Sequence, residues 1–213
     1  MNSTELLDYW RGQVMDQVRP YLWSDTDAFV YMNEAQLQFC RMSEGIPDAT
    51  TTEVCSVPVI TGEITAEIHP SILHFRNAYL VSTGMELTVR NHNSVKKWDN
   101  HTGQITSMII GMQDNLVRWD HTPMLDDEVS LLVFRLPLTN ITDVDQDFEI
   151  DPRHHPSLAL WMKHLGYLKN DVETYDKQQS DRAKAEFEQY CMQVKIEQGR
   201  YRHAPRAVSY GGI

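Results

Sequence analysis

One stretch of sequence decides the fold class, Val129-Ser130-Leu131-Leu132-Val133-Phe134-Arg135-Leu136. It is the strongest predicted β-strand of the chain, because apolar, β-branched and aromatic side chains dominate it as they do in buried strands. Helical periodicity lies on both sides of it, before Thr50 and after Pro152. The sequence therefore predicts β structure inserted into helical structure.

Weaker strand signals precede this stretch. Apolar and polar residues alternate there with the period of a strand that buries one face. The apolar positions are Val54, Val57, Val59, Ile64, Ala66, Ile68, Leu87, Val89 and the run 107–110. Turn-forming clusters of Asn, Asp and Gly separate them. Residues 50–150 are therefore predicted to form an inserted antiparallel β domain.

Two amphipathic helices are predicted before this domain. Leu7, Trp10, Val14 and Val18 recur on one helical face, which predicts a helix from Glu5 to Val18. The second helix begins in the run 24–27, where Ser24 suits an N-cap and two acids suit the first turn, and it ends near Gly45. Because the link is short, residues 1–49 should form an antiparallel helical hairpin.

Two further helices are predicted after the β domain. Pro156 suits a first helical turn, and the apolar stripe that follows it is Leu158, Trp161, Leu165 and Leu168. The last helix, from about Asp171 to Arg202, buries Ala183, Phe187 and Val194. The predicted fold class is thus α+β. An antiparallel four-helix bundle, made of hairpin 1–49 and the helical pair 151–203, is interrupted by the β domain, and an extended C-terminal arm, 204–213, completes the chain.

The composition is typical of a folded, soluble protein. The chain has 213 residues, of which 41% are hydrophobic, and no apolar run reaches the roughly 20 residues that span a bilayer. No signal peptide is expected, so Cys40, Cys55 and Cys191 are interpreted as reduced, buried thiols. We therefore expect no membrane partner.

Residues that could carry chemistry do not form a recognised constellation. His154, His155 and His164 lack the spacing of a shared metal ligand set, and the acidic run 143–149 lacks the glycine and the final glutamate of a calcium loop. No nucleotide-binding or hydrolase motif occurs. We expect no catalytic residue, no metal and no cofactor. The alternative is a small metal-dependent hydrolase, or another enzyme, that uses histidines and acids of the β domain.

Charge is distributed unevenly along the chain. The net charge is −11, but from Lys195 onward four cations stand against one acid, a local +3 that leaves −14 for the rest. An acidic body disfavours gripping nucleic acid by its phosphates. Arg200 and Arg202 suit a helix end, whereas Arg206 lies beyond Pro205. Either the basic end docks on a partner, or it serves a DNA-binding module, a reading that so few cations support weakly.

Two tryptophans and one charged pair are candidate subunit contacts. Trp98 and Trp119 lie in polar segments of the β domain, and Trp is enriched where proteins meet. Burial in the core explains both tryptophans equally well. Arg182 and Glu186, on the last helix, complete this set.

Five segments carry a resemblance to a known family: 28–40, Ile68-His69-Pro70-Ser71-Ile72-Leu73, 131–137, His154-His155-Pro156-Ser157-Leu158 and the last helix with its arginine-and-glycine tail. In these segments the chain resembles the head-to-tail adaptor proteins of short-tailed phages, the head-completion group that includes tail tubular protein A. The region from Gly103 to Thr122 departs from the family, because it lacks a proline-rich run before the last strand.

The resemblance implies a structural virion protein and not an enzyme. Such proteins form a ring, commonly of twelve copies, that joins the portal to the tail nozzle or tail tube and lets double-stranded DNA pass without specific binding. It implies assembly in the host cytoplasm and a final place in the virion neck. It also implies that the C-terminal arm docks on the portal through Arg200, Arg202, His203, Pro205, Arg206, Tyr210, Gly211 and Gly212.

Overall fold

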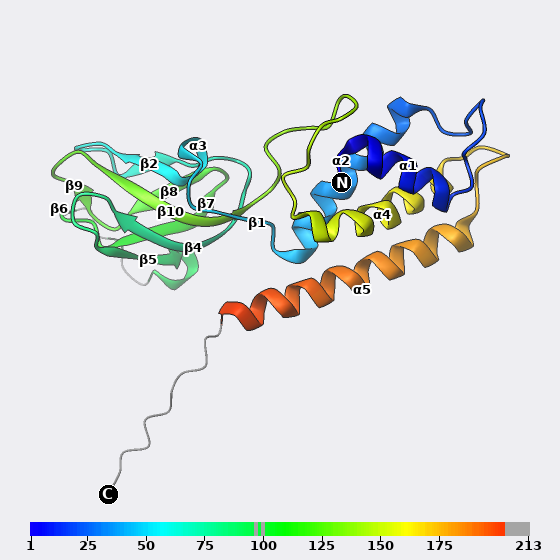
Figure 1. The fold of residues 1–213 in the computed structure, drawn as a ribbon. Helices are drawn as coiled ribbons and strands as arrows, with labels where there is room; N and C mark the ends of the chain where they lie inside the picture. The colour runs from blue at the N-terminus through cyan, green and yellow to red at the C-terminus, as the bar shows by residue number, and fades with distance from the viewer. Residues whose placement is uncertain (96–97, 99–100, 203–213) are drawn as a thin grey trace, which may run out of the picture. The chain divides into compact units, whose positions relative to one another are not determined.

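A computed structural model describes residues 1–95, 98 and 101–202. The chain divides into two compact units, of which one combines Met1–Ser43 with Thr139–Ile213 and the other is Glu44–Leu138. The first unit is helical, and the second is built on a β-sheet (Figure 1). No helix in the described part of the chain is long and apolar enough to cross a membrane.

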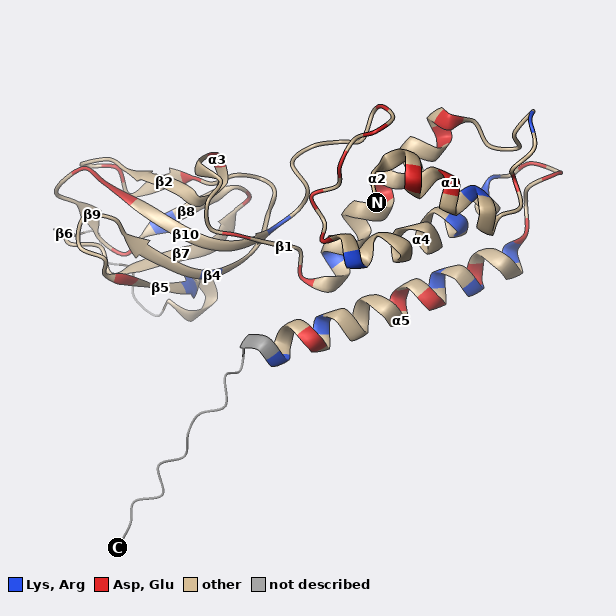
Figure 2. Cartoon of the chain, in the orientation of Figure 1, with Lys and Arg blue, Asp and Glu red and all other residues tan. Residues whose placement is uncertain are grey.

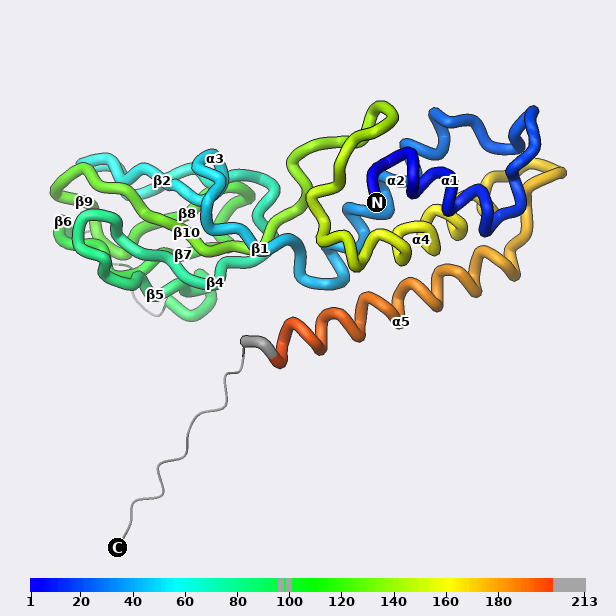
Figure 3. The backbone as a smooth tube through the Cα atoms, viewed as in Figure 1, coloured from blue at the N-terminus to red at the C-terminus, as the bar shows by residue number. Residues whose placement is uncertain are grey.

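The helical unit is organised around one central helix. Its helices are α1 (Ser3–Gln13), α2 (Asp25–Ser43), α4 (His155–Leu168) and α5 (Lys177–Arg202), and the short 3-10 turn η2 (Pro152–His154) leads into α4. Helices α1, α2 and α5 all pack on α4, as the tube in Figure 3 shows. Aromatic rings fill the contacts. Trp10 meets Trp23 with ring centroids 5.5 Å apart, and Trp161 meets Phe187 at 5.1 Å.

The predicted starts of α2 and α4 are confirmed, whereas α1 begins two residues earlier than predicted, at Ser3, and α5 begins about six residues later, at Lys177. Ser24 Oγ accepts the Asp27 backbone N–H over 3.1 Å at the start of α2, which satisfies one of the free amides there. Pro156 lies in the first turn of α4. At α1 the cap is Asn2, which exchanges hydrogen bonds with Glu5 in a capping box. The buried face of α5 follows the predicted stripe, with Ala183, Phe187, Cys191 and Val194 all in the core.

The first helix ends earlier than predicted. It stops at Gln13, and Met15 takes a left-handed conformation with φ of 58°. The carboxylate of Asp16 accepts the backbone N–H groups of Leu22 and Trp23, so hydrogen bonds of the connecting loop replace the helix. Val18, predicted on the apolar stripe, is consequently 79% exposed. The predicted hairpin would pack α1 against α2. In the structure α1 packs chiefly on α4 instead.

The β unit contains a curled sheet (Figure 1). Among the described residues its strands are β1 (Ile46–Asp48), β2 (Ser56–Val59), β3 (Thr65–Glu67), β4 (Ile72–Leu80), β5 (Glu86–Asn91), β7 (Ser107–Gln113), β8 (Leu116–Trp119) and β10 (Asp127–Arg135). Seven of them follow the order β1-β10-β4-β5-β7-β8-β3, and β2 also pairs with β10. A small second sheet joins β6 (Thr102–Gly103) to β9 (Thr122–Pro123).

Strand β10, which contains the strongest strand signal of the sequence, organises this sheet. One edge of it pairs with β4, and the other pairs with β2 near Val129 and with β1 near Val133. Its side chains Val129, Leu131 and Val133 are fully buried. They enter a core shared with Leu80, Leu87, Met108, Val117 and Trp119.

The predicted fold class, a four-helix bundle interrupted by an antiparallel β domain, is wrong. Five α-helices occur in the described residues, since the one-turn helix α3 (Thr52–Cys55) lies inside the β unit. The curled main sheet is mixed, because β5 and β7 pair in parallel. The small sheet of β6 and β9 is parallel as well. The segment between β5 and β7, which includes the 3-10 turn η1 (His92–Ser94), crosses over instead of closing a hairpin, and parallel pairing requires such a crossover.

Candidate interaction surface

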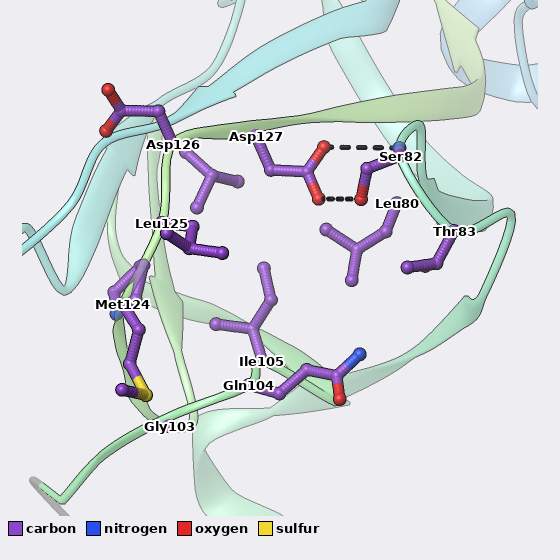
Figure 4. Close-up of a pocket in the computed structure, with 12 residues that line it drawn as sticks. Leu80, Ser82, Thr83, Gly103, Gln104, Ile105, Met124, Leu125, Asp126 and Asp127 are labelled. Atoms are coloured by element: carbon purple, nitrogen blue, oxygen red, sulfur yellow. Dashed lines mark hydrogen bonds between the residues drawn. The ribbon is translucent and has the colours of Figure 1, made fainter.

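An apolar pocket opens at the β9–β10 end of the β unit. It has a volume of about 330 Å³ and is lined by segments that are distant in sequence. The lining residues are Val59, Leu80, Ser82, Thr83, Gly103, Gln104, Ile105, Pro123, Met124, Leu125, Asp126 and Asp127. Figure 4 shows Leu80, Ile105 and Leu125 pointing into it. Hereafter these residues are called the apolar pocket.

Two carboxylates fix the loops around the pocket. Asp126 Oδ1 accepts hydrogen bonds from the backbone N–H and the hydroxyl of Thr61, each over 2.7 Å. These bonds lower the pKa of Asp126. Asp127 accepts from the Ser82 hydroxyl over 2.6 Å and from the Ser82 backbone N–H (Figure 4). It also accepts from the Glu128 backbone N–H. Burial disfavours its charge, but the hydrogen bonds outweigh that cost and lower the pKa of Asp127. Both groups therefore remain negative at neutral pH.

Large apolar side chains near the pocket face solvent. Met124 is 61% exposed and Leu125 is 79% exposed, and Ile60 and Val81 are also exposed in the neighbouring turns. Met124 and Leu125 belong to the pocket lining, and Ile60 and Val81 follow the lining residues Val59 and Leu80 in sequence. Exposed apolar side chains beside an apolar pocket are typical of a protein-contact site.

A second, smaller feature of the β unit surrounds Trp98. It is a pocket of about 190 Å³, lined by Arg90, Val95, Trp98, Ser107, Ile109, Asp120 and His121. The guanidinium of Arg118 lies over the Trp98 ring, 4.9 Å from its centroid, and so holds the indole by a cation–π contact. Asp120 accepts the amide and hydroxyl of Thr106, and these bonds outweigh its burial and lower its pKa. Trp98 remains 44% exposed.

The predicted subunit contacts separate into accessible and buried residues. Trp98 is accessible, whereas Trp119 is fully buried in the core of the sheet and lies away from the surface. Arg182 and Glu186 form an exposed ion pair of 3.0 Å, one turn apart on α5. Lys and Arg alternate with Asp and Glu along this helix (Figure 2). For Trp119 the alternative reading, burial in the core, is thus the one that the structure gives.

The predicted portal-binding residues fall mostly outside the described residues. His203, Pro205, Arg206, Tyr210, Gly211 and Gly212 are not described, and of Arg202 only the backbone is, as the last residue of α5. Arg200 is exposed near the end of the same helix. Val194 is the last residue of α5 that is described as buried.

The histidines of η2 and α4 are packed side chains. His154 Nδ1 lies 2.8 Å from the Tyr190 hydroxyl, His155 Nε2 lies 2.7 Å from the Ile150 carbonyl oxygen, and His164 Nδ1 lies 2.8 Å from Ser180 Oγ. Burial lowers the pKa of His154 and of His164. In the described residues no group of three His, Cys, Asp or Glu side chains is arranged to hold a metal ion.

The three cysteines are buried thiols that form no disulfide. Burial raises the pKa of the Cys55 thiol to about 11 and that of the Cys191 thiol to about 12. Both groups are therefore protonated at neutral pH and poorly nucleophilic.

Sequence reasoning missed the apolar pocket. The one local signal of this pocket in the sequence is the apolar pair Met124-Leu125, which lies between Pro123 and Asp126 in a segment whose other residues are typical of a turn. Apolar residues in a turn are unusual unless a neighbour covers them.

No protein-family model matches the chain, and no curated protein matches it significantly.

Proposed function

We propose that this chain is a structural virion protein that forms a ring between the portal of a capsid and the tail of a short-tailed phage. In this proposal the ring continues the DNA channel, and the C-terminal arm docks on the portal. The protein acts in the neck of the virion after assembly in the host cytoplasm. The sequence resemblance supports the proposal, and so do three features of the molecule.

The observation that carries the proposal is the overhang of α5. This helix has 26 residues and α4 has 14, which correspond to about 39 and 21 Å at the rise of an α-helix. Val194 is its last buried residue among those whose burial is described, and between Lys195 and Arg200 only Gln198 and Gly199 are partly buried, so these turns have little cover from the helical core. Such a helix presents the chain end that follows it to a neighbouring protein.

Surface charge is the second feature. The chain carries a net charge of −11, and its C-terminal end, from Lys195 onward, is basic. A ring of acidic subunits repels the phosphates of DNA, so that DNA slides through its channel without specific binding. The basic end is then free to contact a partner protein.

Exposed apolar surface on the β unit is the third feature. A ring subunit needs contacts with its two neighbours and with the tail nozzle or tail tube. The apolar pocket with Met124 and Leu125, and the exposed ring of Trp98, supply surfaces of the kind that such contacts bury.

Mass photometry of the full chain, alone and mixed with portal rings encoded by the same genome, tests the proposal. We expect portal rings to gain the mass of a ring of this chain. Deletion of residues 204–213 should abolish that gain, while circular dichroism and the urea midpoint stay unchanged. Arg206→Ala should weaken attachment, whereas the matched control Arg153→Ala should not, since Arg153 lies on the helical unit away from the arm in sequence. A monomer that leaves portal rings unchanged would contradict the proposal.

A further inference from the structure

Helix α5 has a second apolar stripe, on the face that is turned away from the helical core. Its buried residues, which run from Ala183 to Val194, lie on one face of the helix. Ala185, Met192 and Ile196 lie on the opposite face, because they are seven and four residues apart. Met192 is 66% exposed and Ile196 is 50% exposed. Large apolar side chains on the outer face of a charged helix are typical of a surface that another helix covers.

This outer face has the residue spacing of a coiled-coil seam, in which steps of three and four residues alternate. Large and small side chains both occur along it. A Cβ added at Gly199 would meet no atom within 4 Å, so this residue leaves a hollow that a long side chain can fill. Hereafter the α5 seam comprises Arg182, Ala185, Gln189, Met192, Ile196 and Gly199.

Two α5 seams fit together when they run antiparallel. If Gln189 of one copy faces Met192 of another, Ala185 faces Ile196 in the next layer. One layer further, Gly199 faces the long stem of Arg182. Small residues therefore meet large ones in the outer layers, which is how helices interlock in a close-packed contact.

The charges beside the seam select this arrangement. Asp181, Glu188 and Lys195 recur every seventh residue along one border of the seam, and in an antiparallel pair this border faces itself. In the register above, Glu188 of each copy faces Lys195 of the other. A shift of seven residues would set Glu188 against Glu188 or Lys195 against Lys195. A parallel pair would set Asp181 beside Glu186 and Lys195 beside Arg200, and like charges repel.

Both members of this charge pair are accessible to a second copy. Glu188 lies 3.8 Å from Lys184 on its own helix, but both side chains are 46% exposed, and such exposed pairs are weak. A carboxylate accepts from more than one donor, so Glu188 can keep Lys184 and gain a second cation. Lys195 is exposed one turn beyond Cys191.

We propose that two copies of the free protein associate through antiparallel α5 seams, with Glu188 of each copy beside Lys195 of the other. The contact has two-fold symmetry and closes on itself, so it does not continue from subunit to subunit as a ring contact does. It concerns the protein before it joins a partner and does not depend on the proposed ring. Because the seam is short and its charge pairs are exposed, we expect a weak dimer whose population rises with concentration.

Disulfide trapping of the full chain tests the register. One preparation carries Ala185→Cys, the other is isotopically heavy and carries Ile196→Cys, and the two are mixed in a glutathione redox buffer. We expect disulfides between heavy and light chains, because these two positions face each other. Neither preparation alone should form dimers. Two copies of the same position would be eleven residues apart along the helices, or about 16 Å, and a disulfide reaches about 7 Å.

Charge reversal tests the pairing without new cysteines. Lys195→Glu and Glu188→Lys should each raise the dissociation constant of the dimer about tenfold in sedimentation equilibrium, since the two-fold axis turns one substitution into two like-charge pairs. The chain with both substitutions should dimerise as the wild type does. The control is Arg41→Glu, at an exposed position of α2, which changes the net charge as Lys195→Glu does and should leave the constant unchanged. These side chains are exposed, so the urea midpoint should change little.

Each other outcome overturns the inference. Disulfides within each preparation, and none between the two, would mean that the seams run parallel. Chains that stay monomeric at every concentration and form no disulfide would mean that the seam does not bind a second copy. If Lys195→Glu and Arg41→Glu weaken the dimer equally, net charge and not the Glu188–Lys195 pair governs association. None of these results bears on the proposed ring, which the mass of portal complexes tests.

Discussion

Arg11 donates a hydrogen bond from Nη1 to Asp16 Oδ2 over 2.6 Å, and both side chains are at most 4% exposed. Each partner also fixes the loop that follows α1. Arg11 donates to the Trp23 carbonyl oxygen and lies 3.6 Å from the centre of the Tyr21 ring. Asp16 accepts the Leu22 N–H. This buried pair therefore sets the path of the chain between α1 and α2.

Loss of the Arg11 side chain should destabilise the protein strongly. Arg11→Met leaves the Asp16 carboxylate buried without its cation, and breaking a buried pair in this way costs about 3–5 kcal/mol. Urea unfolding at pH 7 measures the loss. The control is Arg153→Met, whose partner Asp151 is exposed, and which should cost less than about 1 kcal/mol. Equal effects of the two substitutions would refute the role of the Arg11–Asp16 pair.

The sequence predicts where the helices of this chain lie better than it predicts which helices pack against each other. Ser24, Pro156 and the stripe from Ala183 to Val194 are local signals, because caps, prolines and periodicity act within a few residues. The end of α1 depends instead on Asp16, whose partners lie up to seven residues further along the chain. Since periodicity reports which face of a helix is buried, but not against what, it could not show that α1 packs on α4.

The sheet and the candidate surface depend on contacts that are distant in sequence. The β-branched residues of the predicted strands identify β2 and β10, but nothing local distinguishes the parallel β5–β7 pair from a hairpin. The apolar pocket likewise forms where segments 80–83, 103–105 and 123–127 meet. Trp98 and Trp119 have similar polar neighbours in sequence, yet one is exposed and one is buried. Only the pairing of β8, which carries Trp119, separates them.

Gly45 should not tolerate a side chain. Its φ is +95°, a conformation that favours glycine, and a Cβ added there would lie 2.8 Å from the Arg135 carbonyl oxygen. A strained backbone residue alone costs about 1–3 kcal/mol, so Gly45→Ala should lower the free energy of unfolding by more than this, because its Cβ also meets the Arg135 backbone. Gly62→Ala is the matched control, because Gly62 has a similar φ of +83° but open space around it. If the two substitutions cost the same, the clash with the Arg135 backbone is unimportant.

Acid should destabilise the β unit through Asp48. Burial disfavours its charge, but hydrogen bonds from Thr51, from the Arg135 guanidinium and from the Thr50 N–H outweigh that cost, so the pKa of Asp48 lies far below its ordinary value of 3.8. The stabilisation is complete above pH 3.8 and is lost as the pH falls through the folded pKa. Asp48→Asn should therefore flatten the fall of the urea midpoint below about pH 4.

The control for this prediction is Asp8→Asn, on the exposed face of α1. It should leave the acid slope of the urea midpoint as it is in the wild-type chain. A slope that Asp48→Asn leaves unchanged would show that the Asp48–Arg135 contact does not govern acid stability.

The cysteines should react only when the protein opens. Cys55 and Cys191 have raised pKa values because they are buried, so few thiolates are available at about pH 8. Modification by a disulfide reagent should be at least about a hundredfold slower in the native protein than in urea, where all three thiols react. Mass spectrometry after a short pulse identifies the modified residues. Rapid labelling of Cys55 without urea would contradict the burial of this thiol.

Mild acid should weaken the helical unit through its buried histidines. Burial lowers the pKa of His154 and of His164 below the ordinary value of 6.5. As the pH falls through 6.5, these two histidines take up protons in the unfolded chain but remain neutral in the folded chain. The free energy of unfolding is therefore highest above this pH and declines below it. The urea midpoint should therefore fall as the pH is lowered from about 7.5 to about 5.5 at constant ionic strength.

His164→Gln should reduce this slope, even if it lowers the midpoint at every pH by disturbing the Ser180 contact. His74→Gln changes an exposed strand residue and should keep the wild-type slope. A midpoint that stays flat or rises toward the acid end of this range would mean that His154 and His164 accept protons in the folded state.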